Sequence, residues 1–138
     1  MAKFEKPFET TRELFNNQIK VIGLHEQCKI DIVTNNRLKE IFKVTKANDY
    51  VKFKNGIDVI IFLNEQVFEY LEEPQRQLII EESLAYIVYN NEKGIVEVKK
   101  PDVKTFSGVL SKFTYEQYAK TQTLIKETMA QLKDSASE

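Results

Sequence analysis

The spacing of apolar residues divides the chain into helical and extended segments. Thr10–Glu13 has the spacing of a helix capping box, and the apolar residues after it predict a first helix over about residues 11–21. Apolar and polar residues alternate over residues 28–34, which predicts a strand. Five consecutive apolar residues at 59–63 predict a strand covered on both faces, and the segment EQVFEYL after it predicts a short helix.

The remaining segments are less regular. Residues 41–56, IFKVTKANDYVKFKNG, predict two short strands around a polar turn at KAND, with many of their aromatic side chains facing inward. A second helix is expected over about residues 74–90, with Leu84 and Ile87 towards the core. The segment IVEV at 95–98 predicts a short strand.

These elements predict an α+β fold, a single small domain over residues 1–138 in which three or four helices flank a small sheet. A last helical region is expected over residues 101–132, with its second part, 119–132, extending beyond the domain core. The polar tail 133–138 is expected to fray.

Composition is that of an ordinary globular domain, with 42% hydrophobic residues, 30% charged residues and a net charge of -1. The longest apolar runs are far shorter than the roughly 18 residues of a membrane-spanning helix, and the N-terminus lacks the apolar core of a secretory signal. The single cysteine, Cys28, excludes an intramolecular disulfide, fits a reducing cell interior, and is expected to be a core residue rather than a nucleophile.

Charge is segregated along the chain. Residues 37–56 contain six basic and two acidic residues, a balance of +4, whereas residues 64–82 contain six glutamates and one arginine, a balance of -5. Two interpretations of this pattern stay open. The two charged segments are simply faces exposed to solvent, or they form a dipolar surface that orients a binding partner. The candidate partner-binding residues on the basic segment are Lys43, Lys46, Tyr50, Lys52 and Lys54.

A family resemblance follows from the segment PQRQLIIEESLAYI, which comes after the apolar strand and the short helix. Gln75 and Arg76, the aliphatic residues after them, and the later segment DVKTF at 102–106 carry the similarity. On these residues the chain resembles the phage metallopeptidase family, whose domain is small and zincin-like. The resemblance covers about residues 10–118 and implies a phage origin and expression in a bacterial host.

The resemblance also implies where a metal site would lie. In an H-E-x-x-H helix the two histidines bind Zn²⁺, and the glutamate acts as a base towards the metal-bound water. The corresponding positions hold Glu82, Ser83 and Tyr86, and the third-ligand position falls on Thr105. Tyrosine and threonine hydroxyls are not ionised at neutral pH, and serine cannot replace a carboxylate base. We therefore expect no metal, no cofactor and no catalysis.

The expected function is that of a non-catalytic, metallopeptidase-like phage protein that binds a phage or host protein as a structural or accessory factor. Two alternatives stay open. One is a divergent metal-dependent hydrolase that uses Glu81, Glu82 and Asp102. The other is a nucleic-acid-binding accessory protein, although its pI of about 6.0 is low for that role. Location in the host cytoplasm is expected, with association with the virion as an alternative and without a membrane partner. The sequence favours neither a monomer nor an oligomer.

Overall fold

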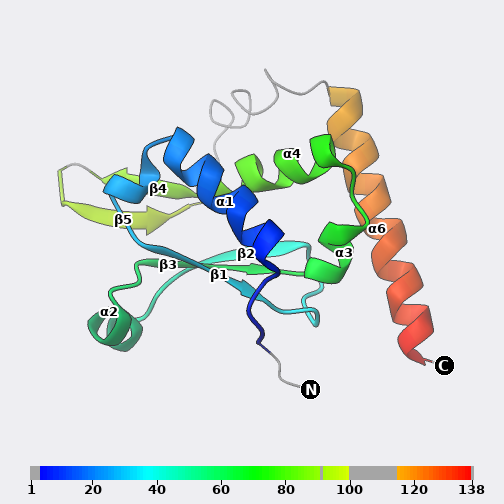
Figure 1. The fold of residues 1–138 in the computed structure, drawn as a ribbon, viewed down its shortest axis with the longest axis horizontal. Helices are drawn as coiled ribbons and strands as arrows, with labels where there is room; N and C mark the ends of the chain where they lie inside the picture. The colour runs from blue at the N-terminus through cyan, green and yellow to red at the C-terminus, as the bar shows by residue number, and fades with distance from the viewer. Residues whose placement is uncertain (1–3, 91, 100–114, 138) are drawn as a thin grey trace.

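The structure is a computed structural model that describes residues 4–90, 92–99 and 115–137 of the chain. Its centre is a three-stranded sheet with the strand order β1-β3-β2 (Figure 1). The central strand β3 (Val59–Leu63) pairs in parallel with β1 (Ile30–Thr34) and antiparallel with β2 (Phe42–Lys46). The predicted α+β class and single small domain are confirmed, with two small sheets in place of the single expected one.

One face of this sheet carries the core. Helices α1 (Glu9–Val21) and α4 (Glu73–Leu84) pack on this face (Figure 1). A short 3-10 helix, η1 (Leu24–Glu26), follows α1. The side chains of β3 alternate between buried and partly buried, so one face of this strand is fully covered, as predicted, and the other face is partly covered. On the other face the ring of Phe4 lies 5.5 Å from the ring of Phe62.

The second sheet is an antiparallel hairpin of β4 (Ile87–Asn90) and β5 (Ile95–Val98). The prediction of a helix to residue 90 is therefore wrong, because the β-branched and aromatic residues after Leu84 pair with the segment IVEV across a tight turn. Leu84 (3% exposed) and Ile87 (8%) are buried as predicted, whereas Val88 is 41% exposed.

The predicted second strand of residues 41–56 is also wrong, because this part of the segment forms helix α2 (Asp49–Asn55). The Asn48 side chain accepts a hydrogen bond from a backbone N–H in the first turn, and Gly56 ends the helix in the left-handed conformation, with φ 71°. The helix buries none of its residues. Tyr50 (67% exposed) and Phe53 (86% exposed) face solvent instead of the core.

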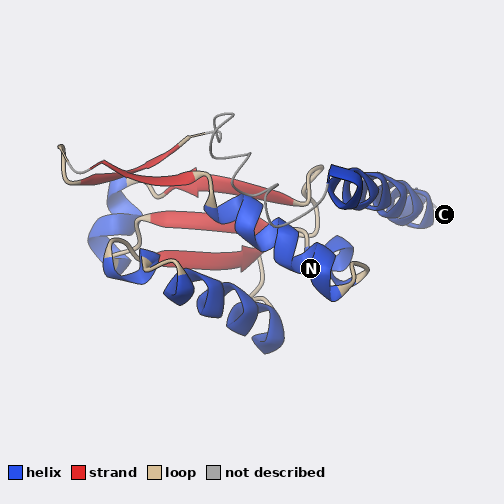
Figure 2. Ribbon diagram, turned by 90° about the horizontal axis from the view of Figure 1, so that it is seen from above, coloured by secondary structure: helices blue, strands red, loops and turns tan. Residues whose placement is uncertain are grey.

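Two further helices complete the described part of the chain. The short α3 (Glu65–Glu69) follows β3 directly, and α6 (Tyr115–Ser137) is one continuous helix across residue 119. Helix α6 and the β4–β5 hairpin lie at opposite ends of the molecule (Figures 1 and 2). The predicted start of the last helical region at residue 101 lies outside the described residues. Among the helices that are described, none combines the length and the apolar character needed to cross a membrane.

Candidate functional site

A cavity of about 460 Å³ lies between strand β2 and helix α6, and we refer to it as the β2–α6 cleft. The loop before β2 and the first half of the strand form one wall, and α6 forms the other. The end of α4 contributes Glu82 and Tyr86. The lining residues are 39–44, Glu82, Tyr86, Gln122, Ile125, Lys126 and Met129.

The spacing of Glu82 and Tyr86 places both side chains in this cleft, as residues one helical turn apart on one face. Tyr86 lies just beyond α4, and its backbone N–H donates to the Ser83 carbonyl at 3.2 Å. Its ring meets the ring of Phe42 edge-on, with 5.5 Å between the centroids. Tyr86 therefore packs the end of α4 against the start of β2.

Ser83 does not reach the cleft. Its side chain is fully buried, and its hydroxyl donates to the Ile80 carbonyl at 2.8 Å. Ser83, which the resemblance maps to the family's general-base position, thus has neither a carboxylate nor access to the cavity.

Glu82 contributes to the cleft a buried polar atom without a hydrogen-bond partner in the described part of the chain. The Tyr118 hydroxyl, from α6, donates to its Oε1 at 3.4 Å. Its Oε2 is buried and has no hydrogen-bond partner among the described residues. Burial raises the pKa of Glu82, and the hydrogen bond from Tyr118 opposes this effect.

The same environment keeps the neighbouring phenol neutral. Burial, followed by the negative charges of Glu82 and Glu40, raises the pKa of Tyr86. A neutral phenol, a buried serine and one carboxylate do not provide the donor set that Zn²⁺ takes in a tetrahedral site. No group of three potential metal-ligating side chains occurs in the part of the chain that the structure describes. Thr105 and Asp102 lie outside that part.

The lone histidine and cysteine lie at a separate, open cavity beside the end of α1. The Cys28 thiol donates to the Leu24 carbonyl at 3.7 Å. Burial, together with the negative charge of Asp58, raises the pKa of Cys28 to about 11. Cys28 is therefore a protonated thiol at neutral pH, in agreement with its prediction as a core residue.

The structure separates the candidate partner-binding residues into two places. Lys43 lines the β2–α6 cleft and Lys46 ends β2. Tyr50, Lys52 and Lys54 lie on α2 rather than on the predicted hairpin.

Polar contacts help to fix α2 to the sheet. The Lys52 ammonium lies 3.0 Å from an Asp58 carboxylate oxygen, and the Lys29 ammonium donates to the Asn55 carbonyl at 3.1 Å. Burial of Asp58 acts to raise its pKa, but the backbone N–H of Lys29 and the charge of Lys52 lower it overall. The exposed aromatic residues Tyr50 and Phe53, with Lys54 beside them, form what we call the α2 surface.

Part of the acidic segment is structural, which the charge pattern alone did not reveal. Glu65 is buried, and its carboxylate accepts hydrogen bonds from the Phe8 backbone N–H and the Thr34 hydroxyl, both at 3.0 Å. Glu72 forms a capping box with Gln75 at the start of α4. These two glutamates are therefore already used within the fold.

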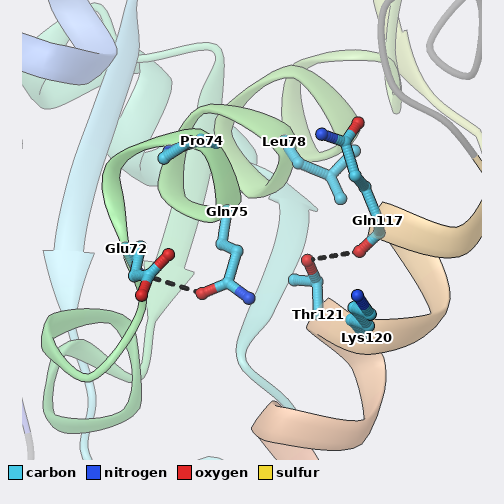
Figure 3. A pocket seen from close by; sticks show the side chains of 7 residues that line it. All are labelled: Glu72, Pro74, Gln75, Leu78, Gln117, Lys120 and Thr121. Atoms are coloured by element: carbon cyan, nitrogen blue, oxygen red, sulfur yellow. Dashed lines mark hydrogen bonds between the residues drawn. The ribbon is translucent and has the colours of Figure 1, made fainter.

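A smaller cavity, of about 190 Å³, lies on the other side of α6, against the start of α4 (Figure 3). Gln75 pairs with Glu72 at its edge, and the Thr121 hydroxyl donates to the Gln117 carbonyl at 2.8 Å. Cavities thus flank α6 on both sides, and of the two only the β2–α6 cleft contains a buried polar atom with no described partner.

A family model described as "Putative phage metallopeptidase" matches residues 8–132, and the chain belongs to this family. No curated protein and no solved structure matches the chain.

Proposed function

We propose that this chain is a non-catalytic member of the family that binds an extended segment of a partner protein in the β2–α6 cleft. The family's phage character supports a partner in the infected bacterial cell, either a phage protein or a host protein. The host cytoplasm is the proposed location, with association with the virion as the alternative.

The edge of β2 is the observation that carries this proposal. In an antiparallel pair, residues that exchange backbone hydrogen bonds with the neighbouring strand alternate with residues whose N–H and C=O groups point away. The Ile41 carbonyl accepts a hydrogen bond from a backbone N–H just after β3 (2.7 Å). The Ala47 N–H donates a hydrogen bond to a carbonyl just before β3 (2.9 Å). Phe42 and Val44 therefore turn their backbone groups away from β3.

Phe42 and Val44 are both lining residues of the cleft. Strand β5 approaches β2 but forms no ladder with it, so the outward backbone groups of Phe42 and Val44 have no hydrogen-bonded strand partner within the described residues. An extended segment can add to such an edge through main-chain hydrogen bonds while its alternate side chains enter the cavity. The volume of about 460 Å³ is enough for a few side chains.

Two features support binding without hydrolysis. Ser83 is buried away from the cavity, and Tyr86 is a neutral phenol packed against Phe42. A segment bound in the cleft would meet two carboxylates, the partly buried Glu82 and the exposed Glu40, and no group of metal-ligating side chains among the described residues that could activate water.

Selection of short random peptides displayed on a carrier tests this function. We expect the wild-type protein to enrich extended peptides and to return them intact, as judged by mass, after incubation with added Zn²⁺. Gln122→Trp, which fills the cleft from α6, should weaken binding by about tenfold or more. Gln131→Trp places the same side chain on an exposed position of α6 outside the cleft and should leave binding unchanged. Cleavage of the peptides, or undiminished binding by Gln122→Trp, contradicts the proposal.

The α2 surface is a candidate second contact with the same partner. Tyr50 and Phe53 are exposed three residues apart on a helix that buries nothing, so packing within the described fold does not explain them. Aromatic residues are enriched at protein interfaces, and tyrosine is common among the residues that contribute most to binding.

A further inference from the structure

We infer that Glu82 selects a basic side chain, lysine or arginine, in the segment that enters the β2–α6 cleft. The inference rests on the proposed function and adds the chemistry of the residue that the cleft accepts. Three observations carry it: the position of Glu82 in the cavity wall, the incomplete hydrogen bonding of its carboxylate, and the exposure of the other charges around the cavity.

The carboxylate lacks a donor. Oε1 receives one long hydrogen bond from Tyr118, at 3.4 Å, and the buried Oε2 receives none from the described residues. A buried carboxylate oxygen without a partner is costly, and a donor that enters the cavity removes that cost. Ammonium and guanidinium groups are the side-chain donors that also compensate the charge, and their hydrogen bonds to carboxylates are about twice as strong as neutral ones.

The lysines around the cavity do not reverse this preference. Lys39, Lys43 and Lys126 line the cleft but are exposed, so water and salt screen their charges. Glu82 is only partly exposed, and its interactions are screened less. The aliphatic part of a lysine or arginine also suits the walls that Phe42, Ile125 and Met129 provide.

A matched pair of peptides tests the inference. Peptides selected on the wild-type protein should share one basic position, and norleucine at that position, which keeps the chain length of lysine but removes the charge, should weaken binding by about tenfold or more. On Glu82→Gln the lysine and norleucine peptides should bind within about twofold of each other. Glu81→Gln changes the neighbouring carboxylate of α4, which does not line the cleft, and should discriminate as the wild-type protein does.

Two results would overturn the inference while leaving the proposed function in place. One is a set of selected peptides without a shared basic position. The other is full discrimination between lysine and norleucine by Glu82→Gln. If the folded wild-type protein enriches no peptide, the proposed function fails, and the inference fails with it.

Discussion

Helices α4 and α2 are held in the fold by opposite means. Helix α4 buries five of its side chains, among them Leu78, Ile79 and Ile80, against the sheet and its neighbours. Helix α2 buries none and is fixed by an asparagine cap, a glycine stop and the contacts of Lys52 and Lys29. Core packing restricts which residues α4 can carry, whereas the exposed face of α2 is free to carry residues for contact with a partner.

The largest effect is therefore expected in α4. Leu84 is 3% exposed, so Leu84→Ala leaves a cavity in the core and should lower the free energy of unfolding by about 2–5 kcal/mol in urea denaturation. The control is Val88→Ala on β4, at a side chain 41% exposed, which should cost much less. A loss below about 0.5 kcal/mol for Leu84→Ala would mean that the core is misplaced.

A smaller loss of stability is expected when a polar contact between α2 and the sheet is removed. Asp58→Asn removes the ion pair with Lys52 and should cost about 1 kcal/mol at neutral pH. Because the pKa of Asp58 is lowered from 3.8 in the folded state, its stabilisation is complete above that value and is lost as the pH falls through the folded pKa. The unfolding free energies of the variant and the wild type should converge in acid. If the difference in unfolding free energy between the variant and the wild type stayed constant as the pH fell to the folded pKa, the charge of Asp58 would not be what stabilises the fold.

At Glu82, in contrast, removal of the charge is expected to raise the free energy of unfolding. Its pKa is raised above 4.5 in the folded state, so its carboxylate destabilises the fold as the pH rises through the folded pKa, and the cost is absent below 4.5. Glu82→Gln should therefore raise the free energy of unfolding by roughly 0.5–1 kcal/mol at neutral pH, with no gain in acid. Denaturation series at several pH values measure this difference, and a neutral-pH loss of stability would show that the carboxylate is well compensated.

The smallest effect is expected on the α2 surface. Phe53 is 86% exposed, so Phe53→Ser should change the free energy of unfolding by less than about 0.5 kcal/mol. If α2 is a contact surface, the same variant should weaken partner binding. A large loss of stability would instead show that Phe53 packs within the fold.

The contrast between the two helices also explains how far the sequence predicted the fold. Core-facing periodicity identified α1, β3, α3 and the start of α4. Apolar residues and lysines alternate in α2 as they do in a strand, and the two signals for a helix there, the cap at Asn48 and the stop at Gly56, are residue types that are equally typical of turns. The end of α4 was predicted too late because the helical apolar spacing continues into β4, whose extended conformation depends on pairing with β5.

The site was predicted in part for a similar reason. The four-residue spacing was enough to place Glu82 and Tyr86 at one cleft, although Tyr86 lies in the turn just beyond α4. The hydrogen bond between Tyr118 and Glu82 joins residues 36 positions apart, and the cleft itself depends on how α6 packs against β2. Neither has a local sequence signal.

The zinc content of the purified protein tests most directly whether this scaffold has lost its metal chemistry. The protein would be expressed with added zinc, treated with a mild chelator and analysed for metal per chain. The resemblance places Glu82, Ser83 and Tyr86 at the family's ligand and base positions, so we expect a content far below stoichiometric. Retention of about one zinc ion per chain would contradict a non-catalytic role and favour a rearranged metal site.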